Sequence, residues 1–598
     1  MTDATLTAGQ GLLVQESVFA PSVASPGMGG DDTLTPIDLY LRSQQELTAV
    51  DRFSRLHDDD ASSHLQPAQA RYYQDLIPLG PPGEGQQYAF SVDLDSCTGC
   101  KSCVTACHSL NGLDEGESFR SAGLLIGARD RSDGVGDGLE PWQQTVTTAC
   151  HHCIDPACLK GCPVDAYEKD PVTGIVRHLD DQCIGCSYCT LTCPYEVPRY
   201  NARLGIVRKC DMCSDRLAVG EAPACVQGCP THAISVEVID RSTALAALVD
   251  QPGVALVPNA PPSSLTLPTT SYRSLRPMPA QAVAGDHHSL RPSHSHLPLA
   301  VMLVLTQVSV GAFVADLMLR AVASDVFAAT IRPYAAAGAL IVAVLALGAS
   351  TFHLGRPLHA WRAVLGLGHS WLSREIVTFS VFAAAAAAYA GAVWRSLSPA
   401  LVTILGSFVV ISGVAGVLCS AMIYAVTGRR WWRLAVTAPK FVLTAAATGP
   451  ALALTLGGFA LAVSPTGAGA VEGGALRSAV PLLGVIVLAT VAKLALEGVV
   501  LLHLRDATFT DERRTAILLT DDLRTLSVRR VTAALIGGVV LPLVLVGLWS
   551  EPVTSTTTLP WSLVLLSITL GLLVAGELAE RRCFFSAVSA PRMPGALS

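Results

Sequence analysis

Long apolar stretches fill the C-terminal half of the chain, whereas the N-terminal half has only short apolar runs. Eight of the long stretches each approach the roughly 20 residues that a helix needs to cross the hydrocarbon core of a membrane. They cover approximately residues 297–319, 334–353, 373–394, 400–425, 437–463, 479–504, 530–549 and 560–580. This pattern predicts an all-α bundle of eight transmembrane helices.

The N-terminal half divides by composition. One amphipathic stretch, Pro36–Leu56, lies within an otherwise Gly-, Pro- and Ser-rich region, and short apolar runs such as Ile234–Ile239 predict short strands. A later segment rich in proline predicts a semi-extended linker. The expected organisation is a partly disordered N-terminal extension (1–88), a cysteine-rich domain (89–240), the linker (241–296), the membrane domain (297–588) and a C-terminal tail (589–598).

Composition excludes a single compact soluble domain. Of the 598 residues, 50% are hydrophobic and only 15% are charged, with a mean hydropathy of +0.43. From Leu297 onward the chain has 21 basic and 13 acidic residues, whereas the residues before it have 20 and 35. Two physically different halves therefore share one chain.

The basic residues also predict the orientation in the membrane. Eight crossings place both ends on one side, and the loops and flanks on that side have 19 basic residues against 4 on the other. Met1–Pro26 shows neither a Sec nor a twin-arginine signal. The positive-inside rule then predicts a multi-pass protein of the inner (cytoplasmic) membrane, with the cysteine-rich domain and both termini in the cytoplasm.

Sixteen of the 18 cysteines lie between Cys97 and Cys229. In the reducing cytoplasm, such density favours metal binding over disulfides. The first and third groups have the spacing C-x2-C-x2-C-x3-C, in which three thiolates hold one iron–sulfur cluster and the fourth serves a neighbouring cluster. The four groups are Cys97, Cys100, Cys103, Cys107; Cys150, Cys153, Cys158, Cys162; Cys183, Cys186, Cys189, Cys193; and Cys210, Cys213, Cys225, Cys229.

Zinc is the alternative metal for cysteines at such spacing, because C-x2-C pairs also build tetrahedral zinc sites. The runs of three cysteines favour iron–sulfur clusters, since a zinc ribbon uses two pairs separated by a loop. No group lacks a cysteine, which favours four [4Fe-4S] clusters over three-iron variants.

The cysteine-rich stretches closely resemble the four-cluster electron-transfer subunit of the dimethyl sulfoxide reductase family of molybdenum enzymes. The segments that carry this resemblance are CTGCKSCVTAC, CHHCIDPACLKGCPVDA, CIGCSYCTLTCPYEVPRYN and KCDMCSDRLAVGEAPACVQGCPTHAI. The resemblance implies an α+β ferredoxin-like domain. It also implies that the outer groups exchange their last cysteines, and the inner groups likewise, which gives the ligand sets Cys97, Cys100, Cys103, Cys229; Cys107, Cys210, Cys213, Cys225; Cys150, Cys153, Cys158, Cys193; and Cys162, Cys183, Cys186, Cys189.

The membrane half resembles the eight-helix anchor of the same family in HLGRPLHAW, LSREI and LLVAGELAERRCFFS. In that family the equivalent His and Glu serve menaquinol binding and oxidation. The resemblance thus favours His353 and Glu375 as quinol ligands and catalytic groups, with Arg356 and Glu577 as weaker candidates. Taken alone, an interfacial His or Glu is more often a snorkelling or capping residue. The family normally makes the two subunits separately, whereas here one chain joins them.

We therefore expect an electron-transfer and anchor protein that oxidises menaquinol to menaquinone. It would pass the electrons through four clusters to a separate molybdopterin catalytic subunit. Its other contacts would be membrane lipid and the quinone pool, and we expect no nucleic-acid partner. The chain has no recognisable active site for a terminal substrate. Two alternatives remain: a quinone-reducing module fed by a formate-type or sulfur-oxidising subunit, and a zinc-bearing scaffold.

Two further expectations concern the membrane half. The histidines after the linker lie near crossing ends or in one loop, so we expect no haem. Lys493 and Glu497 are four residues apart in the sixth crossing and share a helix face, which favours a structural ion pair over a proton path.

Overall fold

The computed structural model describes residues 35–37, 41, 72–130, 139–250, 253–322, 325–463, 475–550 and 558–594. Met1–Ala70 and Arg71–Ser598 form separate units. Most of the predicted N-terminal extension and its helix over Pro36–Leu56, and the end of the predicted C-terminal tail, lie outside the described residues.

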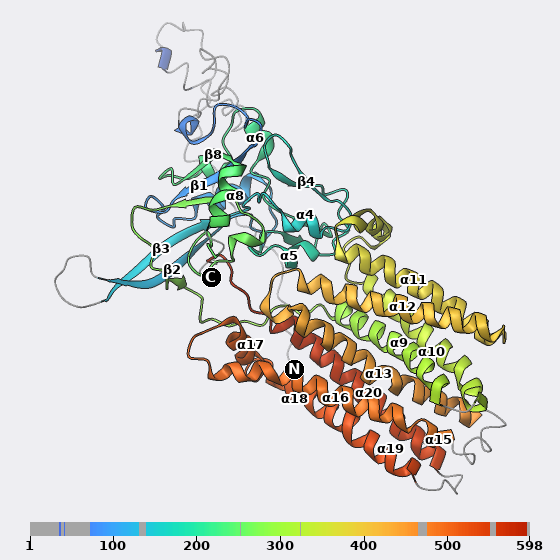
Figure 1. Ribbon diagram of the computed structural model, residues 1–598. Coiled ribbons are helices and arrows are strands. Elements are labelled where there is room, and N and C mark those ends of the chain that lie inside the picture. The colour runs from blue at the N-terminus through green and yellow to red at the C-terminus, as the bar shows by residue number, and fades with distance from the viewer. Residues whose placement is uncertain are drawn as a thin grey trace, which may run out of the picture. The chain divides into compact units, whose positions relative to one another are not determined.

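The cysteine-rich region forms the α+β domain that the sequence predicts (Figure 1). Its strands are β1 (Gln86–Asp93), β2 (Ser121–Asp130), β3 (Leu139–Thr148), β4 (Tyr167–Lys169), β5 (Val176–His178), β6 (Arg199–Asn201), β7 (Ile206–Arg208), β8 (Ile234–Asp240), β9 (Ser271–Arg273) and β10 (Val283–Ala284). Its helices are α3 (Ser102–Leu110), α4 (Ala157–Gly161), α5 (Tyr188–Thr192), α6 (Ser214–Ala218), α7 (Ala224–Gln227) and α8 (Arg241–Asp250).

Small sheets hold this domain together. The strand β1 pairs antiparallel with β8, in the register Gln86↔Asp240 to Val92↔Ile234, and parallel with β9. A second sheet has the order β10-β2-β3, and β4-β5 and β6-β7 form two hairpins. The strand predicted from Ile234–Ile239 is confirmed as β8.

The segment 241–296 differs from the semi-extended linker that its prolines predict. It begins with the helix α8 and supplies two edge strands, β9 and β10, to the two three-stranded sheets. A strand at the edge of a sheet has backbone N–H and C=O groups without hydrogen-bond partners. An extended segment that pairs along that edge, as β9 and β10 do, forms hydrogen bonds with these groups. The connection to the membrane domain is therefore partly folded into the cysteine-rich domain.

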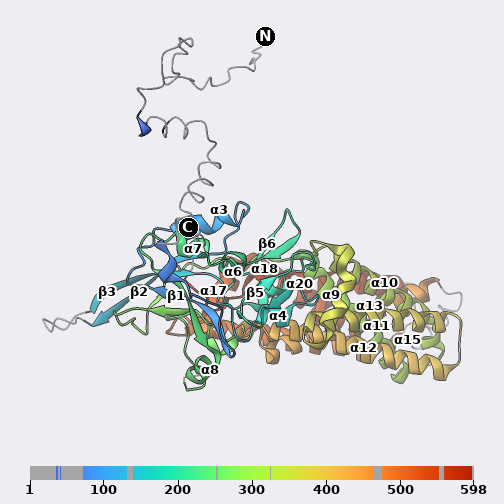
Figure 2. The ribbon, with the colours of Figure 1, turned by 90° about the horizontal axis from the view of Figure 1, so that it is seen from above.

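Within its described residues, the C-terminal half contains eight helical spans that are long and apolar enough to cross a membrane, as predicted. Figure 2 shows these helices side by side. The elements are α9 (Leu297–Val322), α10 (Asp325–Thr351), η4 (Pro357–Gly368), α11 (Trp371–Trp394), α12 (Pro399–Ala425), η5 (Arg430–Trp432), α13 (Leu434–Val463), α15 (Ala475–Ser478), α16 (Val480–Gly498), η6 (Val499–Arg505), α17 (Asp511–Thr520), α18 (Arg524–Leu535), the π-helical turn η7 (Ile536–Val540), α19 (Leu541–Ser550) and α20 (Thr558–Ser586).

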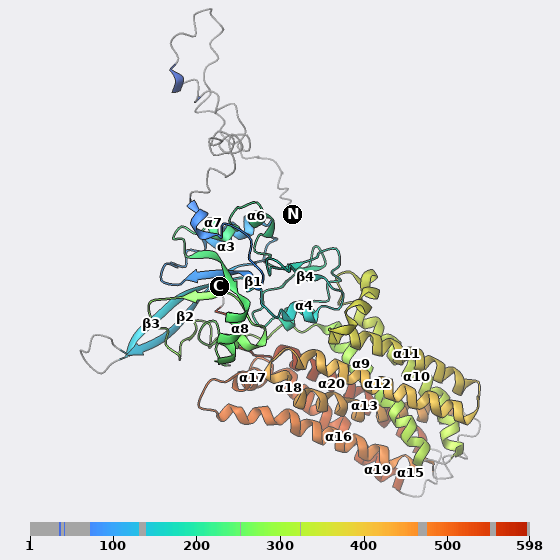
Figure 3. The same cartoon turned by 45° about the horizontal axis from the view of Figure 1, so that its top comes forward.

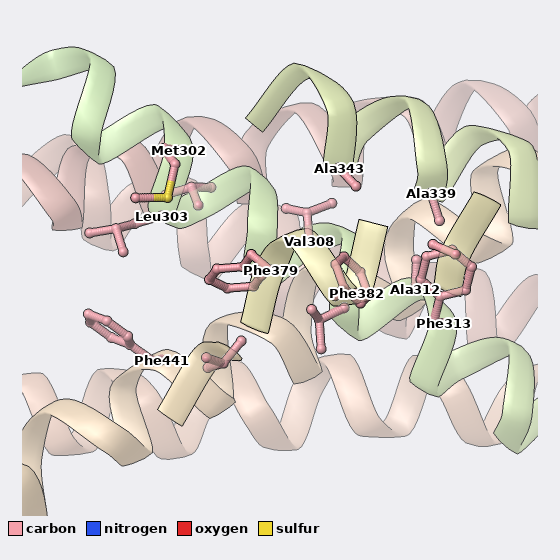
Figure 4. Close-up of a cluster of buried hydrophobic side chains, with 14 of the residues drawn as sticks. Met302, Leu303, Val308, Ala312, Phe313, Ala339, Ala343, Phe379, Phe382 and Phe441 are labelled. Carbon is pink, nitrogen blue, oxygen red and sulfur yellow. The ribbon is translucent and has the colours of Figure 1, made fainter. Parts of the chain in front are cut away.

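The helices α9 and α13 occupy the centre of the bundle, because their spans are 67% and 72% buried against 28–39% for the other six. Their backbones touch: a Cβ added at Gly311 would lie 2.0 Å from the carbonyl oxygen of Ala445. Small residues permit such close packing where lipid provides no hydrophobic drive between helices. Phe379 and Phe382 from α11 and Phe313 from α9 fill the adjacent core (Figure 4).

Three glycines join the two domains by direct backbone contact. Gly185 lies in the third cysteine group, Gly205 between β6 and β7, and Gly355 between α10 and η4. A Cβ on Gly355 would lie 2.0 Å from the Gly205 carbonyl oxygen, and one on Gly185 would lie 2.9 Å from the Gly355 Cα. Both Gly185 and Gly205 also have positive φ, at 69° and 66°. A side chain at either position is therefore disfavoured by the backbone conformation as well as by the lack of space. We call this the triple-glycine contact.

Hydrogen bonds extend the contact along both sides of η4. The Arg356 amide donates to the Ile184 carbonyl at 3.0 Å, and the Gly366 amide donates to the Pro163 carbonyl at 2.9 Å. The Ser370 hydroxyl donates to the Gly161 carbonyl at 2.7 Å. In Figure 3 the coils that precede α11 lie next to α4 and β4, in agreement with these bonds.

We predict that Gly355→Ala loosens the contact between the domains, because the added methyl group has no space beside the Gly205 carbonyl. Overpacking of this kind costs about 1–3 kcal/mol. The measurement is the thermal unfolding midpoint of the purified protein, with limited proteolysis of the loop between α10 and η4 as a second readout. Gly348→Ala is the control, because nothing lies within 4 Å of a Cβ there. Equal midpoints for the two variants would contradict the prediction.

Candidate functional site

The two C-x2-C-x2-C-x3-C runs share one local geometry. Gly99 and Gly185 occupy the same place in their runs and have φ of 74° and 69°. Lys101 and Ser187, which precede the helices α3 and α5, have φ of 62° and 57°. These left-handed residues turn the chain sharply between successive cysteines, and glycine adopts this conformation without strain. The sequence spacing is thus matched by a repeated fold.

All sixteen clustered cysteines are free thiols in the structure. Their electrostatic interactions report which of them lie close together: Cys97 interacts with Cys100, Cys103 and Cys229; Cys107 with Cys213 and Cys225; Cys153 with Cys150, Cys158 and Cys193; and Cys189 with Cys162, Cys183 and Cys186. Cys210 interacts with Cys107 and Cys225, and also with Cys150. The structure therefore brings cysteines of different sequence groups close together, and Cys103 lies near both Cys225 and Cys229.

The surroundings of these sets fit thiolate-bound iron. Burial raises the pKa of Cys107 and of Cys186 to about 12, with neighbouring thiolates as a further cause. Such thiols retain their protons at neutral pH unless a metal replaces them. Among the described residues, no three His, Cys, Asp or Glu form a group that could hold a single metal ion. A cubane cluster differs from a single ion because its thiolates bind separate corners.

Two buried cations lie beside the cysteines. Arg120 is 2% exposed, and its Nε and one terminal nitrogen are buried without a hydrogen-bond partner. It interacts electrostatically with Cys103 and Cys225. The Lys209 Nζ lies 3.7 Å from the Cys150 Sγ and donates to the Cys210 carbonyl at 2.7 Å. Buried positive charges require negative partners, and an iron–sulfur cluster with four thiolate ligands supplies negative charge.

The set Cys162, Cys183, Cys186 and Cys189 touches the membrane domain, and we call it the membrane-facing set. Tyr188, between two of its cysteines, belongs to the buried core of the helix bundle, and its hydroxyl donates to the Ile423 carbonyl at 2.8 Å. The His369 Nε2 lies 3.0 Å from the Cys162 carbonyl oxygen. The triple-glycine contact, which includes Gly185, completes this interface.

Glu375 lies in the second turn of α11 and is 3% exposed. Its carboxylate accepts a hydrogen bond from the Ser420 hydroxyl of α12. Tyr188 of the cysteine-rich domain and Tyr424 both lie near enough to interact electrostatically with it. Glu375 is therefore an almost enclosed carboxyl group next to the membrane-facing set.

His353 lies just beyond α10, which ends at Thr351, and two residues before Gly355. Its Nδ1 is buried and has no hydrogen-bond partner among the described residues. Burial, followed by the charge of His296, lowers the pKa of His353, which keeps the imidazole neutral and able to accept a proton. His353 thus precedes η4 and Glu375 follows it. Gly355, two residues after His353, contacts Gly185, and Glu375 lies near Tyr188.

The two weaker candidates lie in other surroundings. Arg356 bridges the domains, because its guanidinium donates to the Asp180 carbonyl at 2.8 Å in addition to the bond from its amide. Glu577 lies in α20, where it pairs with Lys493 and with Arg530 at 2.9 Å. Within the part of the chain that the structure describes, neither side chain has a recorded contact with His353 or Glu375.

Glu577 belongs to a buried ion-pair cluster that the sequence reveals only in part. The predicted pair of Lys493 and Glu497 is confirmed, with 3.7 Å between Nζ and Oε1. The structure adds partners from three more helices, so that the cluster consists of Lys440, Lys493, Glu497, Arg530, Glu577, Glu580 and Arg581. No local spacing links these residues, apart from Lys493 with Glu497 and the run of Glu577, Glu580 and Arg581.

Comparisons with known proteins agree with the fold and with an iron–sulfur domain joined to a membrane anchor. Residues 142–239 match the family described as "4Fe-4S dicluster domain", and residues 292–587 match "DMSO reductase anchor subunit (DmsC)". The match to a 4Fe-4S family favours iron over the zinc alternative. Residues of the two halves thus match two families that together describe a membrane-anchored iron–sulfur protein.

Curated relatives cover the iron–sulfur half. The protein is 39% identical over 202 residues to the B subunit of anaerobic dimethyl sulfoxide reductase and 38% identical over 202 residues to the probable anaerobic dimethyl sulfoxide reductase subunit YnfG, both of Escherichia coli (strain K12). Each match covers 31% of this protein and 95% of the relative. The match to the formate dehydrogenase-O iron–sulfur subunit of the same organism is 36% over 190 residues, or 29% of this protein and 57% of the relative.

Fold, cysteines and comparisons define a multi-pass membrane protein that carries iron–sulfur clusters, transfers electrons and anchors a molybdopterin oxidoreductase complex. The chain belongs to the family of dimethyl sulfoxide reductase iron–sulfur and anchor subunits, with both parts in one polypeptide.

We predict that Glu577→Gln strongly destabilises the membrane domain, because it leaves Lys493 and Arg530 without their shared counter-charge. Breaking a buried ion pair from one side costs about 3–5 kcal/mol. The control is Glu512→Gln, which removes the partner of the exposed Arg430 and should cost at most about 1 kcal/mol. Thermal unfolding of both variants in one detergent makes the comparison. Similar shifts in the two unfolding midpoints would show that Glu577 does not compensate the buried charges of Lys493 and Arg530.

Proposed function

We propose that this chain oxidises menaquinol at a site formed by His353 and Glu375 and passes the electrons through four [4Fe-4S] clusters to a separate molybdopterin catalytic subunit. The observation that carries the proposal is that the chain next to each residue contacts the third cysteine group. His353 precedes the triple-glycine contact, and Glu375 lies beside Tyr188. A quinol held between them would adjoin the membrane-facing set.

The two side chains match the chemistry of a quinol head group. Oxidation of a quinol to a quinone releases two electrons and two protons, one from each hydroxyl group. The neutral His353 has a buried, unpartnered Nδ1 that accepts one proton, and the Glu375 carboxylate, oriented by Ser420, accepts the other. When bound, an iron–sulfur cluster supplies one-electron transfer. In this proposal Arg356 positions the His353 loop, and Glu577 has a structural role.

The four cysteine sets are proposed as the four cluster sites, with the exchanged last cysteines as ligands. The proximity of Cys229 to Cys97 and Cys103 supports the first set, and that of Cys193 to Cys150 and Cys153 supports one of the inner sets. Burial of Arg120 and Lys209 between the sets supports groups of net negative charge at these positions.

The cysteine-rich domain is proposed to face the cytoplasm, where the 19 basic residues of the flanking loops would remain. A catalytic subunit would dock on that domain, as expected for relatives named as dimethyl sulfoxide reductase subunits. The match to formate dehydrogenase iron–sulfur subunits supports a second candidate, in which electrons run from the catalytic subunit to the quinone. The match of the whole membrane domain to a reductase anchor favours quinol oxidation.

We predict that His353→Ala slows quinol-driven reduction of the clusters by about 100-fold or more, since a positioned general base contributes that much to a proton transfer. Dithionite should still reduce every cluster in the variant, because it needs no quinol site. The visible absorbance of the clusters after addition of a menaquinol analogue gives the rate. Glu375→Gln should behave similarly while retaining its bond to Ser420.

His503→Ala is the matched control for these variants, since His503 pairs with Asp506 at 2.9 Å at the far end of η6. An unchanged rate in His353→Ala would remove His353 from the mechanism. Equal slowing in His503→Ala would point to a general loss of the membrane domain instead.

We predict that Cys229→Ser and Cys213→Ser perturb different clusters, because Cys229 is assigned to Cys97, Cys100 and Cys103, whereas Cys213 is assigned to Cys107 and Cys225. Electron paramagnetic resonance of the dithionite-reduced protein separates the signals, and iron analysis measures the loss. Cys583→Ser, a buried thiol outside the sets, should leave both signals intact. Loss of the same signal in both cluster variants would overturn the exchanged pairing.

A further inference from the structure

A cavity of about 480 Å³ lies outside the proposed quinol site. Its walls come from the strand ends of the cysteine-rich domain, the segment that leads into α9, the helix α17 and the segment after α20. In Figure 1 the chain beyond α20 runs back toward the strands, which is the region that this cavity occupies. The cavity therefore lies where helices α9 and α20 leave the bundle.

The lining of the cavity is strongly basic. It contains five arginines but only two acidic residues, Glu196 and Asp286. Asp286 pairs with Arg592, and Asp511, outside the lining, lies 3.9 Å from an Arg514 nitrogen. Positive charge exceeds negative charge by two even when Asp511 is counted. The five arginines are Arg199, Arg291, Arg429, Arg514 and Arg592.

Two of these arginines are held in place with their charge incompletely balanced. Arg514 is 8% exposed; one terminal nitrogen donates to the His287 carbonyl, whereas its Nε is buried without a hydrogen-bond partner. The Arg429 guanidinium lies over the Trp432 ring, 5.0 Å from its centroid. It interacts electrostatically with Glu196 and Cys193 but forms no ion pair among the described residues. Burial lowers the pKa of both groups, which means that desolvation outweighs the negative charges near them. An anion in the cavity would relieve this imbalance.

We propose that the cavity binds a phosphate group, held by Arg429 and Arg514. Guanidinium groups present paired N–H donors that match the oxygens of a phosphate. The buried Leu518, Val588 and Met593 also line the cavity and provide an apolar wall beside the charged one. The phosphate comes either from the head group of an anionic phospholipid or from free phosphate in solution. This site is independent of the quinol site, because it shares none of that site's residues.

The test uses the full-length protein with its clusters, purified in detergent and depleted of lipid. Thermal unfolding is followed while two probes are titrated separately: phosphatidylglycerol in mixed micelles, and inorganic phosphate at the ionic strength of a chloride control. The double variant Arg429→Gln, Arg514→Gln retains side-chain length and polarity but loses two charges. Arg505→Gln, an exposed arginine outside the cavity, is the matched control.

The proposal expects a rise in the unfolding midpoint that saturates with probe in the wild type and in Arg505→Gln. The affinity of the double variant should be at least about tenfold weaker, since it loses the charge-assisted hydrogen bonds of two guanidinium groups. A rise with phosphatidylglycerol alone identifies a lipid head group, and a rise with both probes identifies a site for free phosphate. No saturable rise, or equal affinity in the double variant, would overturn the proposal. Cluster absorbance confirms that each variant is folded, and quinol-driven reduction is measured separately.

Discussion

The contact between three glycine backbones is the constraint on which the rest of the molecule depends. A cysteine loop, a hairpin and a membrane loop meet where a single Cβ on Gly355 would reach within 2.0 Å of the Gly205 carbonyl. Without side chains between them, the loop that carries His353 lies directly against the membrane-facing cysteine set. Electron transfer between a membrane site and a soluble domain requires such proximity, and backbone contact maintains it more rigidly than long side chains would.

Buried charge is the second constraint, and the two domains meet it differently. In the membrane half, Lys493 is fully buried but has carboxylates from α16 and α20 as partners. In the cysteine-rich domain, Arg120 is equally buried but has thiols rather than carboxylates around it. An ion costs several kcal/mol to bury without compensation. The membrane domain therefore pairs its buried cations with its own carboxylates, whereas the cysteine-rich domain requires the negative charge of its clusters.

The sequence predicted the features that depend on local spacing. Eight apolar stretches became eight spans, and the cysteine runs, with the family resemblance, identified the iron–sulfur domain. It did not predict Tyr188 beside Glu375 or the partners of Lys493 from distant helices, because such contacts follow from helix packing rather than from chain spacing. Tyr188 left one signal, an aromatic residue between two cysteines of one group, but nothing in the sequence indicated what it would touch.

The segment 241–296 explains how one chain can replace two subunits. Its prolines suggest a tether, yet β9 and β10 are built into the two sheets before the chain enters α9. The domains are consequently attached at two separate places, through this folded connection and through the triple-glycine contact. Two attachments restrict rotation far more than one, since a single link leaves the domains free to turn about it. Fusion in this form fixes the geometry between His353 and the cysteines as well as the stoichiometry of the two parts.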